Sequence, residues 1–189
     1  MILPSLLNLH NQCLIAMPSI EDSCFFQSIT YIFEHTHEGA MGLICNRPAP
    51  FTVRDFFMHL NIPFDSFPQL QDPVYVGGPV QRDKGFILHH EAGYFSSSLQ
   101  ISEGIYITTS KDILMAIGEN RGPKHFLIIL GYAGWSAGQL EKEILENAWL
   151  SAPANPSLLF HTPCGNQWQA AAKSVGVDIK MMPSMAGHA

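Results

Sequence analysis

The sequence predicts an α+β fold in which curled, mostly antiparallel or mixed sheets are surrounded by short helices. Residues 1–110 contain about six runs typical of strands but only one or two short helical patterns. Several of these runs are joined by short turns, and strands joined in this way are antiparallel. No internal repeat, low-complexity tract or convincing linker divides the 189 residues, so we predict a single domain over residues 1–189.

Composition indicates a compact globular chain. Hydrophobic residues make up 47% of the sequence, charged residues make up 14%, and the formal net charge is −6. Phosphate neutralisation needs clustered Lys and Arg, which this acidic chain does not offer, so direct nucleic-acid binding is not expected. The N-terminus resembles no signal peptide, no run is long enough to span a bilayer, and the four cysteines form no C-x-x-C pair. These features predict a cytoplasmic protein with reduced thiols.

The first predicted elements are a strand and a β-hairpin. Residues 12–17 form an apolar run that ends at Pro18. Residues 28–35 and 40–46 flank a short polar turn that ends in Gly39. A glycine there supplies the positive φ that a bulged turn requires, so the two runs are predicted to pair.

The remaining elements alternate between strands and helices. Residues 47–50 are rich in proline and are expected to break regular structure. Thr52 and Asp55 resemble a capping box, with Asp in place of the usual Glu, which predicts a helix over residues 52–60. Thr109 or Ser110 can cap a second helix. Strands are predicted at 74–78, 85–90, 104–108, 126–130 and 157–160, and helices at 111–119, 139–150 and 167–177.

One motif raises a catalytic alternative. Residues 134–138 spell G-x-S-x-G, which at a strand-to-helix turn presents a nucleophilic serine. A serine hydrolase built on Ser136 would use a later acid and histidine, and Asp178 and His188 occur in that order. Against this, the preceding strands are predicted to form hairpins rather than parallel strand–helix units, and a penultimate residue is seldom held firmly enough for catalysis. The simpler interpretation is a glycine-rich turn in which Ser136 faces solvent.

No metal or cofactor is predicted. The pairs His35-x-His37 and His161-x-x-Cys164 have a short spacing that zinc uses, but neither is joined by a second pair. Turn and surface histidines are therefore expected.

Two further signals are weak. Gly77-Gly78-Pro79 is not followed by the G-K-S/T of a phosphate-binding loop, so we interpret it as a sharp exit from a strand. Cys45 lies close to Arg47, whose guanidinium would favour a reactive thiolate, but the position suits the core equally well.

Several strings together resemble a known family. E-H-x-x-x-G-A-M-G begins at residue 34, G-G-P-V at residue 77 and G-Y-A-x-W-x-x-G-Q-L-E at residue 131, and further matching stretches cover nearly the whole chain. In these strings the chain resembles the YqgE/AlgH family of bacterial cytosolic proteins. The resemblance implies a single α+β domain of curled, bifurcated sheets with flanking helices.

The resemblance also bears on individual residues. His35 and His188 match the family pattern, as do the members of the third string: Tyr132, Trp135, Gly138, Gln139 and Leu140. The pattern leaves the place of Ser136 variable, which argues against a nucleophile, and it leaves His37, Cys45 and Cys164 free. Some descriptions label the family as transcriptional regulators through an association with alginate production. Because this chain has no convincing helix-turn-helix and no basic face, we expect any regulatory effect to be indirect. A DNA-binding transcriptional regulator is kept as a further alternative, and it predicts an affinity that falls steeply with salt.

The leading functional hypothesis is a non-enzymatic protein that binds a small molecule or a protein partner. Polar and aromatic residues at strand ends are the predicted ligand-binding set: Glu34, His35, Asn46, Arg47, Tyr132, Trp135 and Gln139. Arg47 would face an anion, Asn46 and Gln139 would orient the ligand, and Trp135 would provide a stacking surface. The alternative is that Glu34 and Arg47 only pair across strands and that Trp135 belongs to the core.

Overall fold

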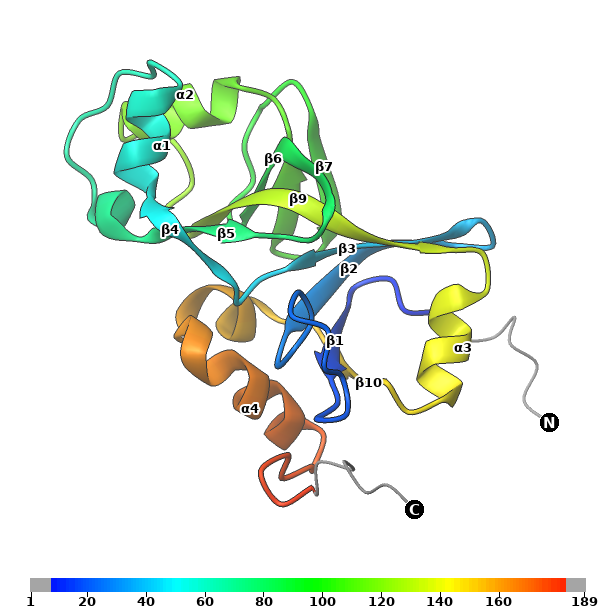
Figure 1. Cartoon of the computed structure of the whole chain (residues 1–189). Coiled ribbons are helices and arrows are strands. Elements are labelled where there is room, and N and C mark those ends of the chain that lie inside the picture. Colours follow the sequence, from blue (N-terminus) through cyan, green and yellow to red (C-terminus); the bar gives the residue numbers. More distant parts are fainter. Residues whose placement is uncertain (1–7, 183–189) are drawn as a thin grey trace.

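A computed structural model describes residues 8–182, whose strands form one branched sheet flanked by helices (Figure 1). The strands are β1 (Gln12–Ala16), β2 (Ile29–Thr36), β3 (Gly39–Ile44), β4 (Pro48–Thr52), β5 (Pro73–Val76), β6 (Val80–His89), β7 (Ser98–Ser102), β8 (Ile105–Thr108), β9 (Phe126–Ser136) and β10 (Trp149–Pro153). The helices are α1 (Val53–His59), α2 (Asp112–Gly118), α3 (Gln139–Leu145), α4 (Cys164–Ser174), the 3₁₀-helix η2 (Pro68–Gln71) and the π-helix η3 (Ser157–His161). The predicted α+β class is confirmed.

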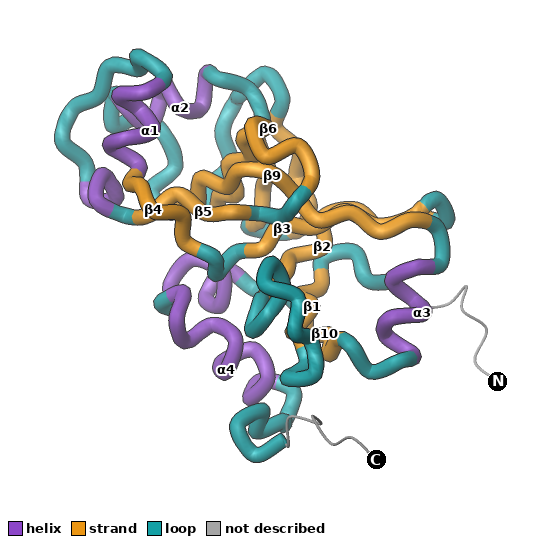
Figure 2. The backbone as a smooth tube through the Cα atoms, viewed as in Figure 1, coloured by secondary structure: helices purple, strands orange, loops and turns teal. Residues whose placement is uncertain are grey.

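Strand β9 joins the two halves of the sheet. The strand order is β10-β1-β2-β3-β9-β6-β8-β7, with β4 and β5 on a side branch. Strand β9 pairs antiparallel with β6 and β3 and parallel with β5. Figure 2 shows the strands in the middle of the molecule, with α1 and α2 at one end and α3 and α4 at the other. The sheet therefore bifurcates at β9, as the family resemblance implied.

The branch point depends on a close approach of two backbone segments. A Cβ built on Gly77 would lie 2.3 Å from the carbonyl oxygen of Gly131, and one built on Gly78 would lie 2.2 Å from the carbonyl carbon of Tyr132. Gly77 also bridges the branches, because its N–H donates to Leu130 and its carbonyl accepts from Ile44. The two glycines therefore serve strand packing, which agrees with their interpretation as a strand exit.

The predicted hairpin and capping box are both present. Strands β2 and β3 pair through residues 30–36 and 39–44, with Gly39 at φ 139°. At the start of α1, Thr52 Oγ1 accepts from the Asp55 N–H at 3.2 Å, and the Asp55 carboxylate accepts from the Thr52 N–H at 2.9 Å. These two donors would otherwise lack partners in the first turn of the helix.

Three hydrophobic clusters fill the spaces between sheet and helices. One lies under α1 and α2, a second lies beneath α3, and the largest packs α4 against the sheet. Helix α4 buries one face that includes Trp168, whose indole N–H donates to the Ala16 carbonyl at 2.8 Å. Among the described residues, no helix has the length and apolar character needed to cross a bilayer.

Several predicted elements were wrong in the second half of the chain. Strand β9 continues through residues 131–136 instead of ending at 130. The predicted helix over 139–150 ends at Leu145, because Asn147 adopts φ 58° and the next residues pair with β1 as β10. The predicted strand at 157–160 is the π-helix η3, a short apolar run that periodicity alone cannot assign.

Three smaller predictions also failed. Residues 48–52 form β4 despite two prolines, which are tolerated because β4 is an edge strand. Strand β7 was not predicted, since three of its five residues are polar and only Ile101 is buried. Neither Thr109 nor Ser110 caps α2; the Ser110 hydroxyl instead bonds the Asp112 carboxylate and accepts from the Ser97 N–H.

Candidate functional site

The G-x-S-x-G motif does not form a nucleophile elbow. Ser136 is the last residue of β9, which pairs antiparallel with β3 at this point, and α3 begins after Gly138 at φ 74°. The Ser136 hydroxyl donates to Gln139 Oε1 at 3.2 Å, and within residues 8–182 no histidine hydrogen-bonds to Ser136. Asp178 lines a separate hollow beyond the C-terminal end of α4, and His188 lies outside the described residues. The serine hydrolase alternative therefore gains no support.

Three of the predicted ligand-binding residues, His35, Trp135 and Gln139, contact glutamates of α3. His35 Nε2 lies 2.9 Å from Glu141 Oε1, and His35 Nδ1 accepts from the Leu9 N–H at 3.0 Å. The Trp135 indole N–H donates to Glu143 Oε2 at 2.9 Å, and Gln139 Nε2 donates to Glu143 Oε1 at 2.9 Å.

Trp149 completes this network. Its indole N–H donates to Glu143 Oε2 at 2.8 Å, so one carboxylate accepts from both tryptophans. The two rings are stacked edge to face, with centroids 6.1 Å apart, and both are almost fully buried. Trp135 therefore belongs to the core, as the alternative interpretation held, and the network anchors α3 to the sheet.

Asn46 and Arg47 hold a loop at the other end of β3. Asn46 accepts from the Ile29 N–H at 2.8 Å and donates to the Gln27 carbonyl at 2.9 Å. Arg47 Nη2 donates to the carbonyls of Cys24 and Phe26, at 3.3 and 2.5 Å. Both side chains thus tie the β1–β2 connection to β3.

The last two predicted residues lie elsewhere. Glu34 is exposed and Arg47 bonds the carbonyls of Cys24 and Phe26, so the cross-strand pair that the alternative interpretation held is absent from the described structure. Tyr132 stacks edge to face on Phe86, with centroids 6.0 Å apart. The seven residues therefore do not form one site, and a ligand-binding role for any of them stays a prediction.

The metal and thiol signals have structural explanations. Both ring nitrogens of His35 are occupied by protein groups, and among residues 8–182 no group of His, Cys, Asp and Glu is arranged to hold a metal ion. Cys45 is fully buried and its thiol donates to the Leu43 carbonyl at 3.2 Å. Burial raises the pKa of Cys45 to about 12, which opposes the reactive thiolate considered above.

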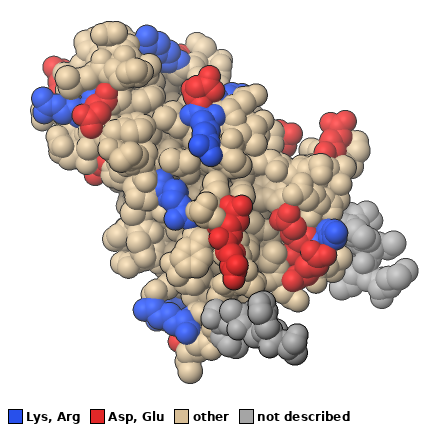
Figure 3. Space-filling model, viewed as in Figure 1, with Lys and Arg blue, Asp and Glu red and all other residues tan. Residues whose placement is uncertain are grey.

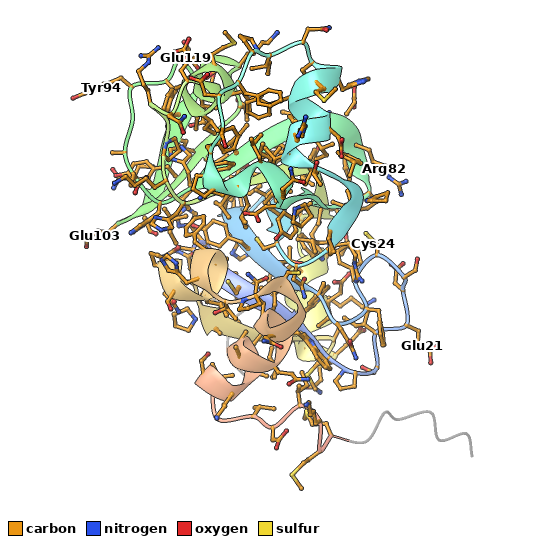
Figure 4. The ribbon with its side chains drawn as sticks, turned by 90° about the vertical axis from the view of Figure 1, so that its left-hand side faces the viewer. Glu21, Cys24, Arg82, Tyr94, Glu103 and Glu119 are labelled. Atoms are coloured by element: carbon orange, nitrogen blue, oxygen red, sulfur yellow. The ribbon has the colours of Figure 1, made fainter. Side chains whose placement is uncertain are left out.

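A polar cleft that the sequence did not reveal lies between η3, the start of α4 and the branch carrying β5. Figure 4 shows this region from the side, with the orange segment of η3 and α4 below the green and cyan half of the molecule. The polar cleft has a volume of about 230 Å³. It is lined by Gln69, Asp72, Pro73, Tyr75, His125, Phe126, Leu127, Leu159, Phe160, His161, Thr162, Pro163, Cys164 and Gln167.

The π-helix η3 fixes the floor of the polar cleft. The Thr162 N–H reaches back to the Ser157 carbonyl at 3.1 Å, which is the wider turn of a π-helix, a feature frequent at functional sites. Gln167, which is 2% exposed, donates through Nε2 to the carbonyls of Leu158 and Leu159 at 3.1 and 3.2 Å. Because both partners are acceptors, the amide orientation is fixed and Oε1 points away from them.

Two residues of the lining each have a buried side-chain atom without a hydrogen-bond partner. Within residues 8–182 five buried side-chain atoms lack one, and Gln167 Oε1 and His125 Nδ1 are among them. Glu91 Oε1 lies 3.5 Å from His125 Nδ1, within the distance of an ion pair but long for a hydrogen bond. Both atoms have almost no accessible surface, so they lie behind the lining and are not open to the hollow.

The rim of the polar cleft carries aromatic and titratable groups. The rings of His125 and His161 meet edge to face, with centroids 4.7 Å apart. Burial raises the pKa of Tyr75 to about 12, and desolvation raises the pKa of the Asp72 carboxyl from its ordinary value. In the sequence, only the pair His161-x-x-Cys164 lies in this region among the candidate sites, and it was considered as a metal site and set aside.

An apolar groove of about 540 Å³ is the main alternative hollow. It is lined by Phe51, Asp55, Phe56, His59, Leu60, Asp83 and Leu130. Four of its seven lining residues are hydrophobic, whereas the lining of the polar cleft includes Gln69, Asp72, His125, His161 and Thr162. The polar cleft is therefore the better candidate for specific recognition.

Comparison with known proteins decides the family. A family model described as AlgH-like matches residues 13–180. This chain belongs to the AlgH-like family. A UPF0301 protein of Thioalkalivibrio sulfidiphilus is 51% identical to it over 96% of this chain and 97% of the relative, and the UPF0301 protein YqgE of Escherichia coli is 46% identical over 97% and 100%. The resemblance found in the sequence is thus confirmed.

Solved structures of similar proteins agree with the fold of this AlgH-like chain. The solution structure of the AlgH protein from Pseudomonas aeruginosa has 42% sequence identity, covers 100% of both chains and has a TM-score of 0.76. The crystal structure of protein DIP2367 from Corynebacterium diphtheriae has 23% identity, covers 86% of this chain and 85% of that one, and has a TM-score of 0.69. The second likeness concerns the fold alone.

Proposed function

We propose that this AlgH-like protein is a binding module that takes a small polar molecule into the polar cleft. The supporting observation is that the π-helix η3 and the start of α4 line one hollow together with polar side chains that are open to solvent, Asp72 and His161 among them. A few polar groups placed around a concave site are what orients a small ligand. The volume, about 230 Å³, is below the roughly 300–1,000 Å³ of sites for drug-sized ligands, so the ligand would be small.

Binding without DNA contact is the simpler route to a regulatory effect. On the face shown in Figure 3, Lys and Arg side chains are interspersed with Asp and Glu and do not form a continuous basic stripe. Protein–DNA affinity rests largely on such a stripe. Any regulation by this protein would then follow from a ligand-dependent contact with another protein.

The proposal is tested with fragments and a variant that fills the polar cleft. The full chain is titrated with single-ring amides, amidines, carboxylates and phosphates while backbone amide shifts are recorded by NMR. At least one probe should shift the amides of Leu127, Cys164 and Gln167. Cys164→Phe should abolish those shifts, because Cys164 lines the polar cleft. Cys24→Phe, at the other partly buried cysteine, is the matched control and should leave them unchanged.

Two results would remove the proposal. One is that no probe of any class shifts these amides. The other is that Cys164→Phe, shown to be folded by its spectrum, binds the same probe as tightly as the wild type.

A further inference from the structure

We propose that the outer edge of β7 binds β7 of a second copy of this chain, through antiparallel strand pairing centred on Leu99. The proposal goes beyond the binding of a small molecule, and no residue of β7 lines the polar cleft. Three observations support it: a strand edge without the usual protection, an exposed apolar side chain at the middle of that edge, and a register that is complementary to itself.

Strand β7 has a free edge. It is one of three strands that pair with a single neighbour in the part of the chain that the structure describes. The other two, β4 and β10, contain prolines, which cannot donate to an added strand. Strand β7 contains neither a proline nor a charged residue, and these are two of the features that usually protect an edge. Of the three edges, that of β7 is therefore the best suited to accept a further strand.

The free hydrogen-bonding groups of β7 belong to Ser98 and Gln100. The Thr109 N–H donates to the Ser97 carbonyl at 3.3 Å, so Ser97 and, by alternation along the strand, Leu99 direct their backbone groups at β8. The N–H and C=O groups of Ser98 and Gln100 consequently point away from β8. Within residues 8–182 no strand lies on that side to pair with them.

Leu99 supplies an apolar contact at this edge. Its side chain is 59% exposed, and its cross-strand neighbour Ile107 belongs to the largest hydrophobic cluster. Figure 4 shows Tyr94 and Glu103, which flank β7 in the sequence, pointing outward at one margin of the molecule. Residues directly opposite each other on antiparallel strands share a face of the sheet. A second Leu99 across the edge would therefore extend the cluster and remove apolar surface of both copies from water.

The register of β7 is complementary to itself. When Leu99 lies on a two-fold axis, it faces Leu99 of the second copy as a pair without mutual hydrogen bonds, with Cα atoms about 4.5 Å apart. Ser98 of each copy then faces Gln100 of the other, and these are the residues whose backbone groups point outward. Each such pair can exchange two N–H···O=C bonds. Residues 97–101 carry no charge, so no like charges face each other.

The neighbouring registers are disfavoured. A register centred on Ser98 would require the Ser96 N–H, which already donates to the Asp112 carboxylate at 2.7 Å. A register centred on Gln100 would require Ser102, which lies beyond a register shift that interrupts the regular pleat. Pairing centred on Leu99 is the one that uses only free groups in regular geometry.

The pairing is short, which sets the expected affinity. Strand β7 has five residues, and the register shift after Gln100 limits its regular part further. A contact made mainly by one such strand buries less than the roughly 1,200 Å² of a stable complex. We therefore expect a weak dimer with a Kd between about 10 µM and 1 mM.

Sedimentation velocity of the full chain across this concentration range tests the association. The wild type should shift from monomer to dimer as its concentration rises. Leu99→Lys removes the apolar contact and places two ammonium groups opposite each other, so it should weaken association by at least about tenfold. Met58→Lys is the matched control, because Met58 on α1 is also 59% exposed and the variant adds the same charge. It should dimerise as the wild type does.

Amide exchange and a mixed-label NOE identify the edge and the register. The Ser98 and Gln100 amides should exchange more slowly as the dimer fraction rises, whereas the Leu99 amide, which faces β8 in both states, should not change. In a sample that mixes ¹³C-labelled and unlabelled chains, an NOE between the α-protons of the two Leu99 residues should appear.

A peptide distinguishes a second copy from other extended partners. A synthetic peptide of residues 94–104 should slow exchange of the Ser98 and Gln100 amides at lower concentration than a scrambled peptide of the same composition. Equal effects of the two peptides would show that the edge accepts any extended chain, and the assignment to a second copy would be overturned.

Two further results would overturn the proposal. One is that the chain stays monomeric across the whole concentration range. The other is that Leu99→Lys dimerises as tightly as Met58→Lys, because the contact would then lie on another face. Since neither variant changes a residue that lines the polar cleft, these results leave the small-molecule proposal to its own test.

Discussion

Removing the Glu143 carboxylate should destabilise the protein through two buried tryptophans. Glu143 Oε2 accepts from the indole N–H groups of Trp135 and Trp149, whose side chains are 7% and 5% exposed. In Glu143→Leu, a side chain of similar size removes every acceptor and keeps water out. Each stranded indole costs about 1–2 kcal/mol, so the free energy of unfolding should fall by about 3 kcal/mol. For a chain of this length, that corresponds to a drop in Tm of roughly 6–12 °C.

Urea unfolding of matched variants measures this effect. Glu143→Gln retains one oxygen for the indoles but loses the charge assistance, so it should cost about 1 kcal/mol. Glu146→Leu is the control, because Glu146 lies on the same helix end with its side chain 62% exposed and only Lys142 nearby, at 3.8 Å. Its effect should stay within about 0.5 kcal/mol. If Glu143→Leu were no more destabilising than Glu146→Leu, the assignment of the network as the anchor of α3 would be wrong.

Two further predictions concern the branch point and a buried histidine. Gly78→Ala should lower the free energy of unfolding by at least about 3 kcal/mol, since the new Cβ would lie 2.2 Å from backbone atoms of Tyr132. Gly165→Ala, whose Cβ would have nothing within 4 Å, should raise the free energy of unfolding by about 0.5 kcal/mol. Equal urea midpoints for the two variants would contradict the close-approach argument. Desolvation lowers the pKa of the buried His89 side chain below its ordinary value of 6.5. As the pH falls, the unfolded chain therefore binds a proton at this histidine before the folded chain does, and the free energy of unfolding decreases below about pH 6.5. His89→Gln should lose less stability than the wild type between pH 7.5 and 5, and parallel losses would show that His89 does not titrate in this way.

The parts of the fold that the sequence predicted have local causes. The hairpin at 28–46 follows from two β-branched runs around a turn, and the start of α1 follows from Thr52 and Asp55. Each of these signals lies within a few residues of the structure that it specifies. The parts that failed depend on distant partners. Trp149 is in a strand because it pairs with β1, which is more than 130 residues away in the sequence. The residues around Trp149 contain no signal of that pairing.

The predicted site failed for a related reason. Asn46, Arg47, Trp135 and Gln139 are polar or amphipathic residues at strand ends, which is where binding residues tend to lie. In the structure their hydrogen-bonding groups are directed at a loop or at Glu143. The side chain that accepts from Trp135 lies eight residues further along, on a helix whose position only the fold determines. A strand-end position therefore could not distinguish a ligand from an internal partner.

The polar cleft shows where unexplained chemistry remains once these internal partners are assigned. The motif from residue 131 to 141 is accounted for by backbone approach, the anchor of α3 and the His35–Glu141 contact. The residues of this motif are therefore explained by their roles in the fold, and the motif gives no evidence for a reaction. Gln167 is different, because its Nε2 satisfies η3 whereas its Oε1 satisfies nothing among the described residues. Because that oxygen is buried, a binding function has to be argued from the side chains that are open to the polar cleft, such as Asp72 and His161.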